Sequence, residues 1–135
     1  MNLFTIVLNV SYCELVGGVV LFGTFYKSCT LKSNKNYKNA QKYFEDGACS
    51  GLLSFELESF EDATKVVNAT KLYSLVVNIG DSKSIITHPA STTHQQLSPE
   101  ELNACGVPAG LIRISCGLES ANDLIEDMKL SLEEL

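Results

Sequence analysis

One arginine stands in the middle of a short apolar run near the C-terminal end of the sequence. The run is Gly110–Gly117, Gly-Leu-Ile-Arg-Ile-Ser-Cys-Gly. Strand residues alternate between two faces, so Ile112 and Ile114 are predicted to pack inward while Arg113 points the other way. A guanidinium stays charged and carries five N–H donors in a planar fork, so it can bind a carboxylate or a phosphate. Its stem could instead cover apolar surface, with the head in water or beside a glutamate, and spacing alone leaves both interpretations open.

The cysteines and histidines do not form a pattern typical of a metal or disulfide site. The cysteines are Cys13, Cys29, Cys49, Cys105 and Cys116. They are odd in number, include no C-x-x-C pair and have no histidine at ligand spacing, so we expect free thiols, several of them core residues. His88 and His94 flank Pro89, which interrupts any helix that could place them on one face, so we expect two loop residues and no metal site.

Length and composition favour one folded domain. The 135 residues are 45% hydrophobic and 19% charged, which is enough for a single core and argues against disorder. The formal net charge is −6, and no basic stripe is present. A phosphate backbone binds basic surfaces, so nucleic acid is not expected as a partner.

Residues 1–30 form an apolar leader that differs from the rest of the chain. Within residues 1–26 the only charged side chain is Glu14, and no Lys or Arg precedes Lys27. A secretory signal needs a basic start, and a membrane span needs about 20 apolar residues without the glycines present here, so we expect neither. The β-branched and aromatic content favours one or two strands.

Four segments after Ser33 begin like helices, each preceded by a serine. In three of them an acidic residue follows three positions later, as in Ser59/Asp62, Ser98/Glu101 and Ser120/Asp123. A serine hydroxyl accepts a hydrogen bond from the exposed N–H groups of a helix start, and an acid meets the positive end of the helix dipole. The predicted helices cover residues 34–45, 60–70, 99–104 and 121–133.

Four candidate strands accompany these helices, at residues 51–57, 72–77, 84–87 and 111–115. Segment 72–77 is apolar nearly throughout, which predicts a central strand. Turn-forming residues at 78–81 predict that it forms an antiparallel or crossing pair with 84–87. The expected fold class is α+β, a small and mostly antiparallel sheet with helices packed on one face. The hydroxyl-rich stretch 87–95 is predicted to be a loop that meets a ligand.

Three ordered blocks carry a resemblance to a known family. They are Asn-Ile-Gly-Asp-Ser-Lys-Ser at 78–84, His-Pro-Ala-Ser-Thr-Thr-His at 88–94 and Leu-Ile-Arg-Ile-Ser-Cys-Gly-Leu-Glu at 111–119. Residues 31–135 thus resemble the C-terminal domain of the Cys/Met-metabolism pyridoxal-phosphate enzymes, which have fold type I. The residues of the first two blocks are most similar to those of the O-acetylhomoserine sulfhydrylases (O-acetylhomoserine aminocarboxypropyltransferases). Cystathionine γ-synthases and γ-lyases tend to show Gly-Gly and a glutamate where this chain has Gly80-Asp81 and Lys83, and they remain the alternative.

The resemblance implies substrate-binding roles for three residues. Arg113 matches the arginine that binds the α-carboxylate of the amino-acid substrate. Ser84 matches a serine that contacts the same carboxylate through its backbone and hydroxyl, and Thr93 matches a threonine that helps hold the arginine. Arg113 would therefore align the substrate rather than transfer a proton. No catalytic residue is assigned.

The resemblance also implies what the chain lacks. Family members bind pyridoxal phosphate through a lysine of a large preceding domain, and neither Lys71 nor Lys83 matches that position. We therefore expect a C-terminal fragment of a cytoplasmic trans-sulfuration enzyme of methionine and cysteine biosynthesis, with no covalently bound cofactor and no activity alone. Its expected partners are the large cofactor domain and the subunits of a homotetramer. The alternative is a non-catalytic interaction module, or a remnant, that complements a separate cofactor domain.

Overall fold

The computed structural model describes residues 51–135 together with 5–6, 15–16, 38 and 42. The elements are β1 (Thr5–Ile6), β2 (Leu15–Val16), β3 (Leu52–Glu56), α2 (Phe60–Ala69), β4 (Ser74–Leu75), β5 (Ile85–Thr87), the 3-10 helix η3 (Pro89–Ser91), α3 (Pro99–Ala104), β6 (Leu111–Ser115) and α4 (Ala121–Leu132). β1 and β2 pair with each other in antiparallel fashion. The remainder of the leader, and the predicted helix 34–45 apart from the helical Lys38 and Lys42, lie outside the described residues.

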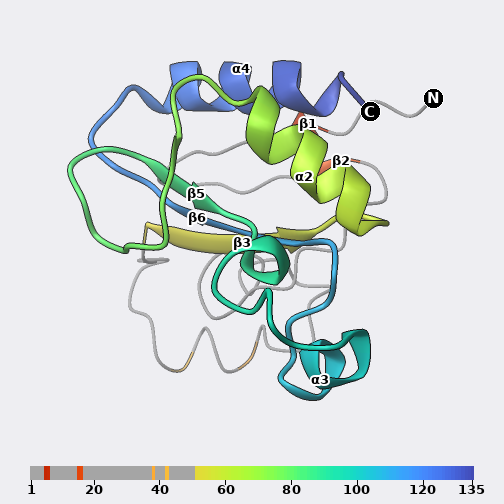
Figure 1. The fold of residues 1–135 in the computed structure, drawn as a ribbon. Coiled ribbons are helices and arrows are strands. Elements are labelled where there is room, and N and C mark those ends of the chain that lie inside the picture. Colours follow the sequence, from red (N-terminus) through yellow and green to blue (C-terminus); the bar gives the residue numbers. More distant parts are fainter. Residues whose placement is uncertain (1–4, 7–14, 17–37, 39–41, 43–50) are drawn as a thin grey trace.

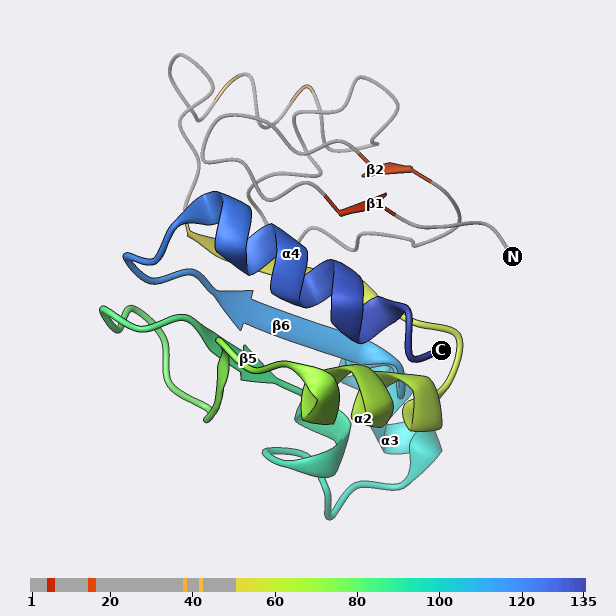
Figure 2. The same ribbon diagram turned by 90° about the horizontal axis from the view of Figure 1, so that it is seen from above.

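The predicted α+β class is confirmed by a four-stranded sheet with the order β3-β6-β5-β4. β6 runs antiparallel to both β3 and β5, and β4 runs parallel to β5. The two longer helices, α2 and α4, cover one face of this sheet (Figures 1 and 2). The short helices η3 and α3 lie toward the opposite side in Figure 1.

The core lies between this sheet and the two long helices. Ile112 and Ile114 of β6 are fully buried, with Phe55 of β3 opposite the first and Ile86 of β5 opposite the second. The helices add Ala63, Val66, Val67, Leu124, Ile125 and Met128. The predicted alternation in β6 is therefore confirmed, because burial of one face fixes the register of the strand.

Segment 72–77 pairs with β5, as predicted, but it departs from the prediction of a central strand. Only Ser74–Leu75 form a strand, which lies at the edge of the sheet and runs parallel to β5. The backbone N–H of Val76 donates back to the carbonyl of Ser74, and the chain then crosses to the start of β5. Leu75, Val76 and Val77 are 49%, 47% and 52% exposed. The prediction was wrong because an apolar run indicates burial without indicating which part of a protein covers it.

Two of the three serine caps form as predicted. The hydroxyl of Ser59 accepts from the backbone N–H of Asp62 at 3.0 Å, at the start of α2. At α3, Ser98 and Glu101 form a reciprocal capping box, and the backbone N–H of Ser98 lowers the pKa of the Glu101 carboxyl. The side-chain cap predicted for Ser120 is wrong, because its hydroxyl accepts no such bond although α4 begins one residue later.

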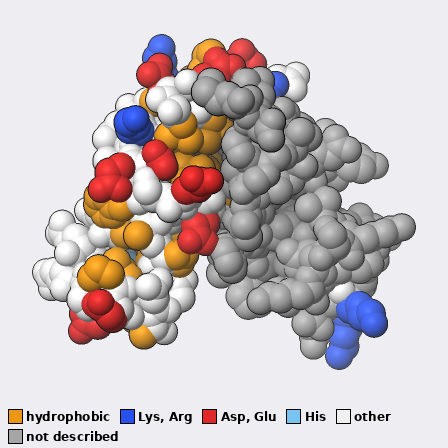
Figure 3. Space-filling model, turned by 90° about the vertical axis from the view of Figure 1, so that its right-hand side faces the viewer, with side chains coloured by type: hydrophobic (Ala, Val, Ile, Leu, Met, Phe, Trp, Pro, Cys, Tyr) orange, Lys and Arg blue, Asp and Glu red, His pale blue; other side chains and the backbone are white. Residues whose placement is uncertain are grey.

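Acidic and apolar side chains are interspersed over the described part of the surface that Figure 3 shows. None of the helices in the described residues is long and apolar enough to cross a membrane.

A buried carboxylate on α4 ties the segment that follows α2 to α4. Both oxygens of Asp127 accept from the backbone N–H of Lys71, at 3.1 and 3.0 Å, and one also accepts from that of Leu72 at 2.9 Å. The next residue, Tyr73, donates its hydroxyl to the carbonyl of Leu124 at 3.0 Å. Burial raises the pKa of Tyr73 far above its ordinary value, with nearby negative groups adding to the effect, so the phenol stays a hydrogen-bond donor.

Asp127→Ala is expected to destabilise the chain by about 2 kcal/mol, because two backbone N–H groups lose a charged acceptor. The matched change Glu126→Ala removes an exposed carboxylate from the same helix and is expected to have almost no effect. Urea unfolding of both variants gives the comparison. Equal losses of stability would show that the buried carboxylate does not hold this junction.

Candidate functional site

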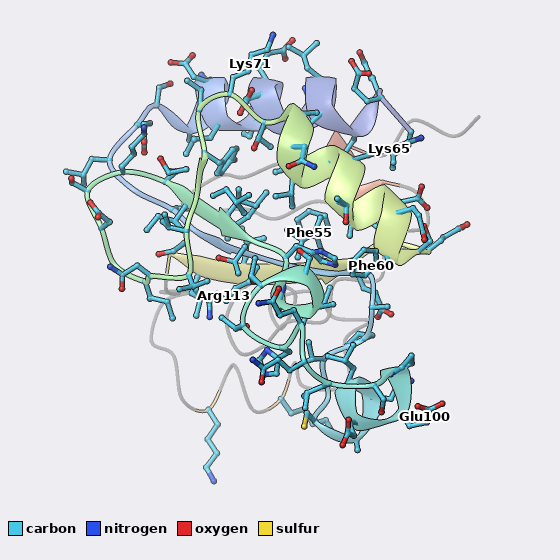
Figure 4. The ribbon with its side chains drawn as sticks, in the orientation of Figure 1. Phe55, Phe60, Lys65, Lys71, Glu100 and Arg113 are labelled. Carbon is cyan, nitrogen blue, oxygen red and sulfur yellow. The ribbon has the colours of Figure 1, made fainter. Side chains whose placement is uncertain are left out.

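Arg113 lies in the middle of a polar row on the sheet face that points away from the core. Its neighbours in register are Ser54 on β3 and Thr87 on β5, which are 4% and 1% exposed. Figure 4 shows Arg113 on the side of the sheet opposite to α2 and α4. It is also the only arginine of the 135-residue sequence. The predicted direction of this side chain is confirmed.

Backbone carbonyls hold the guanidinium. Its Nη2 donates to the carbonyl of Val77 at 2.9 Å and, more weakly, to that of Asn78 at 3.5 Å. Within residues 51–135, no Asp or Glu forms an ion pair with Arg113, so the interpretation of an arginine beside a glutamate does not apply there. Nε and Nη1 make no hydrogen bond among the described residues, and their donors remain for another acceptor.

The carbonyls belong to a segment that crosses the sheet face, residues 76–80, which we call the strap. Thr87 donates its hydroxyl to the carbonyl of Val76, the residue before Val77. At the other end, the backbone N–H of Gly80 donates to the hydroxyl of Ser115 at 3.0 Å. Gly80 has φ +79°, a conformation that favours glycine. Side chains of β5 and β6 thus hold the strap at both ends and in its middle.

Ser84, predicted to contact a substrate carboxylate, is fully buried and binds a carboxylate of the protein itself. Its backbone N–H and its hydroxyl donate to the two oxygens of Glu119, each at 2.8 Å. Its hydroxyl also accepts from the backbone N–H of Gly117 at 2.8 Å. A Cβ at position 117 would clash with the carbonyl oxygen of Ser82, so this close approach requires glycine. The substrate role of Ser84 stays a prediction. Glu119 ends the third family block, but no role was predicted for it.

Glu119 contributes stability that depends on pH. Burial acts to raise its pKa, but the two hydrogen bonds from Ser84 outweigh that effect and hold the pKa below the ordinary 4.5. A carboxyl whose pKa is lower in the folded state stabilises the fold above its unfolded pKa. This contribution is lost as the pH falls through the folded pKa.

Glu119→Gln is therefore expected to lower stability at pH 7 by about 1 kcal/mol, since an amide cannot accept both bonds from Ser84. The difference from wild type should shrink as the pH falls below 4.5 and the wild-type carboxyl takes up a proton. Urea unfolding at pH 7 and pH 3 measures it, with the exposed Glu134→Gln as control. A difference that is the same at both pH values would rule out the charged pair as its cause.

No hydrogen bond joins Thr93 to Arg113 in this structure. It is exposed, and its hydroxyl lies 2.7 Å from Nδ1 of His94. The carbonyls of Val77 and Asn78 hold the guanidinium instead. The positioning role that the resemblance implies for Thr93 stays a prediction.

His88 corrects the expectation that the whole stretch 87–95 is an exposed loop. The histidine is 1% exposed, and η3 begins directly after it. Its Nε2 lies 2.7 Å from the carbonyl of Ala109, to which it must donate, and its Nδ1 lies 2.9 Å from the hydroxyl of Ser91. Phe60 meets the imidazole edge-on at 4.9 Å. Both ring nitrogens are used in the fold, which suits a structural histidine.

The other candidate metal ligands stay apart. No group of three or more metal-binding side chains occurs among the described residues. Two cysteines are described: Cys105 is exposed, and Cys116 is half-buried and packs against the core. The other three lie outside the described residues.

The described lysines do not suit covalent attachment of a cofactor, which needs an amine removed from water. Lys129 is half-buried, and the other described lysines are exposed: Lys38, Lys42, Lys65, Lys71 and Lys83. Figure 4 shows Lys65 and Lys71 on the helical side, away from Arg113. The chemistry that the described site supports is recognition of an acid by Arg113.

Comparisons with known proteins identify the family of the chain. The family model of the Cys/Met metabolism PLP-dependent enzymes matches residues 25–133. The chain is 42% identical over 106 residues to an O-acetyl-L-homoserine sulfhydrylase of Leptospira meyeri, covering 78% of this chain and 24% of that protein. It is 39% identical over 106 residues to an L-methionine gamma-lyase of Fusobacterium nucleatum, covering 78% of this chain and 26% of that protein.

A solved structure shows the same fold. It is a Campylobacter jejuni protein assigned as an O-acetylhomoserine (thiol)-lyase, with a TM-score of 0.72 and 46% identity over 87% of this chain and 26% of that one. That crystal structure contains a lysine joined to pyridoxal phosphate. The chain spans about a quarter of the length of these relatives. Because the family model matches most of its residues, the chain belongs to the Cys/Met-metabolism family of pyridoxal-phosphate-dependent enzymes.

Proposed function

We propose that residues 31–135 form the substrate-carboxylate-binding domain of a sulfhydrylase-type enzyme of trans-sulfuration, acting on O-acetylhomoserine, and that Arg113 binds the α-carboxylate. The observation that carries this proposal is the state of the guanidinium. Neutral carbonyls hold it by one nitrogen, and no acidic side chain of residues 51–135 neutralises it. The charge and the remaining donors are therefore available to an acid.

Arg113 suits recognition of a carboxylate in three respects. Its Nε–H and Nη1–H groups make no hydrogen bond among the described residues, so each can donate a charge-assisted hydrogen bond to a carboxylate oxygen. The carbonyl contacts limit the rotation of the guanidinium before substrate arrives, which reduces the entropy cost of binding. Ser54 and Thr87, buried on either side, keep water away from the base of the side chain. Arg113 thereby binds and orients the substrate.

The bond-making chemistry belongs to another part of such an enzyme. Pyridoxal phosphate supplies an electron sink for amino-acid reactions when it is bound. No described lysine suits its attachment, so the proposal assigns this chain no step of bond cleavage or proton transfer.

An apolar surface beside Arg113 is consistent with an interface to a cofactor-bearing domain. Leu75, Val76, Val77 and Ile79 are 49%, 47%, 52% and 56% exposed, on β4 and the strap. Contiguous aliphatic surface of this kind is typical of an interface. The relatives are about four times the length covered here, so a domain that could cover the strap exists in them. The homotetramer stays a prediction.

A chimeric enzyme tests the proposal. Residues 31–135 would replace the matching quarter of the Leptospira meyeri sulfhydrylase, and consumption of O-acetylhomoserine would be measured with sulfide present. The chimera is expected to be active, and the truncated parent without this quarter is expected to be inactive. A chimera that folds and binds cofactor as the parent does, yet leaves O-acetylhomoserine intact, would contradict the sulfhydrylase assignment. Turnover of methionine instead would favour a lyase.

The exposed apolar strap also favours the alternative of a module that complements a separate cofactor domain. Mixing the intact 135-residue chain with the truncated parent tests it. Activity together with a complex in gel filtration is expected if the chain works in trans. The absence of both would exclude this alternative.

A further inference from the structure

Thr87 and Arg113 hold neighbouring carbonyls of the strap. The two residues stand directly opposite each other on β5 and β6. Thr87 binds the carbonyl of Val76, and Arg113 binds that of Val77. The placement of one carbonyl therefore restricts the placement of the next, since adjacent peptide units are rigid and share a Cα.

Hydrogen bonds, rather than apolar packing among the described residues, fix the strap. All five of its residues are exposed, and β4 before it contributes only two residues to the sheet. The strap is held at one end by Thr87 and at the other by Ser115. Without the bond from Thr87, the guanidinium would be the one remaining side chain among the described residues that holds the N-terminal half of the strap to the sheet face.

We propose that Thr87 is a positioning residue for Arg113. It holds the carbonyl of Val76 and thereby fixes the carbonyls of Val77 and Asn78 that set the direction of the guanidinium. Thr87 itself touches no substrate. The importance of Thr87 for catalysis rests on the proposed function of Arg113, whereas its effect on the guanidinium is independent of that function.

Two substitutions separate the hydroxyl from the shape of the side chain. Thr87→Val keeps the volume and the β-branch but removes the donor, and Thr87→Ser keeps the donor. Thr87 is 1% exposed, so the valine variant retains its packing. Thr64→Val is the matched control, because Thr64 donates to the carbonyl of Phe60 at 2.9 Å on α2, away from the strap.

¹⁵N NMR of the guanidinium in the intact 135-residue chain provides the first readout. Arg113 is the only arginine of the sequence, so its signals need no assignment. A guanidinium held by one Nη gives two resolved Nη signals, whereas one that rotates freely gives an average. Wild type, Thr87→Ser and Thr64→Val are expected to show two signals, and Thr87→Val one. Two resolved signals in Thr87→Val would overturn the proposal. If the valine variant does not fold, Thr87→Ala is used in the same measurement with the same expected result.

Kinetics of the chimera provide the second readout. Thr87→Val is expected to raise KM about fivefold with little change in kcat, Thr87→Ser to restore it, and Thr64→Val to leave it unchanged. Adding Thr87→Val to Arg113→Lys is expected to cause no further loss, because a residue that acts through Arg113 has no effect once Arg113 is gone. Additive effects would overturn the proposal. If Arg113→Lys leaves KM unchanged while the NMR result holds, the proposed function fails and the positioning of the guanidinium stands.

Discussion

Arg113→Lys is expected to raise the KM of the chimera for O-acetylhomoserine about thirtyfold, with a smaller change in kcat. An ammonium is a compact point charge without the planar fork whose fixed N–H directions let a guanidinium donate to the carbonyl of Val77 and to a carboxylate at the same time. The loss corresponds to about 2 kcal/mol, the size expected when a charged hydrogen-bonding pair is broken. Steady-state kinetics with O-acetylhomoserine as the varied substrate provide the measurement.

The control is the opposite substitution, lysine to arginine, at an exposed position. Lys65→Arg, on the outer face of α2, keeps the charge and is expected to leave KM and kcat unchanged. An Arg113→Lys enzyme that binds cofactor normally and keeps the wild-type KM would exclude Arg113 as the carboxylate ligand.

Phe55→Ala is expected to cost about 4 kcal/mol of stability, enough to unfold a large fraction of a marginally stable domain. The side chain of Phe55 is 0% exposed and lies opposite Ile112 in the β3–β6 pair. Its removal leaves a cavity under the strand that carries Arg113, in addition to the lost transfer free energy.

The matched change is Phe60→Ala at the start of α2, with a cost of about 1 kcal/mol. Phe60 is 40% exposed, and the centroid of its ring lies 4.9 Å from that of the His88 ring. Urea unfolding of the two variants of the intact chain measures the difference. Similar losses for the two phenylalanines would show that Phe55 does not lie in the core described here.

Local signals predicted the elements that carry Arg113. The caps at Ser59 and Ser98 depend on residues three positions apart, which a sequence shows directly. The alternation of β6 was predictable because only one of its faces is apolar. The hydroxyl of Ser120 was not used as predicted, because a serine before a helix permits a cap without requiring it.

Contacts between residues far apart in the sequence could not be predicted. The partners of Arg113 are backbone carbonyls, which every residue has and no pattern marks. Glu119 lies 35 residues from Ser84, and Asp127 lies 56 residues from Lys71, so neither pair shares a local motif. The parallel pairing of β4 likewise depends on a crossing of the sheet that turn residues do not specify.

The preference of the enzyme for an acid over an amide tests the central claim most directly. KM of the chimera is measured for O-acetylhomoserine and for the same molecule with its α-carboxylate converted to a carboxamide, before and after Arg113→Lys. If Arg113 binds the carboxylate, the wild-type residue gives a preference for the acid of about thirtyfold or more, and lysine removes most of it. An equal preference in the two enzymes would contradict the assignment of Arg113 as the residue that binds the substrate.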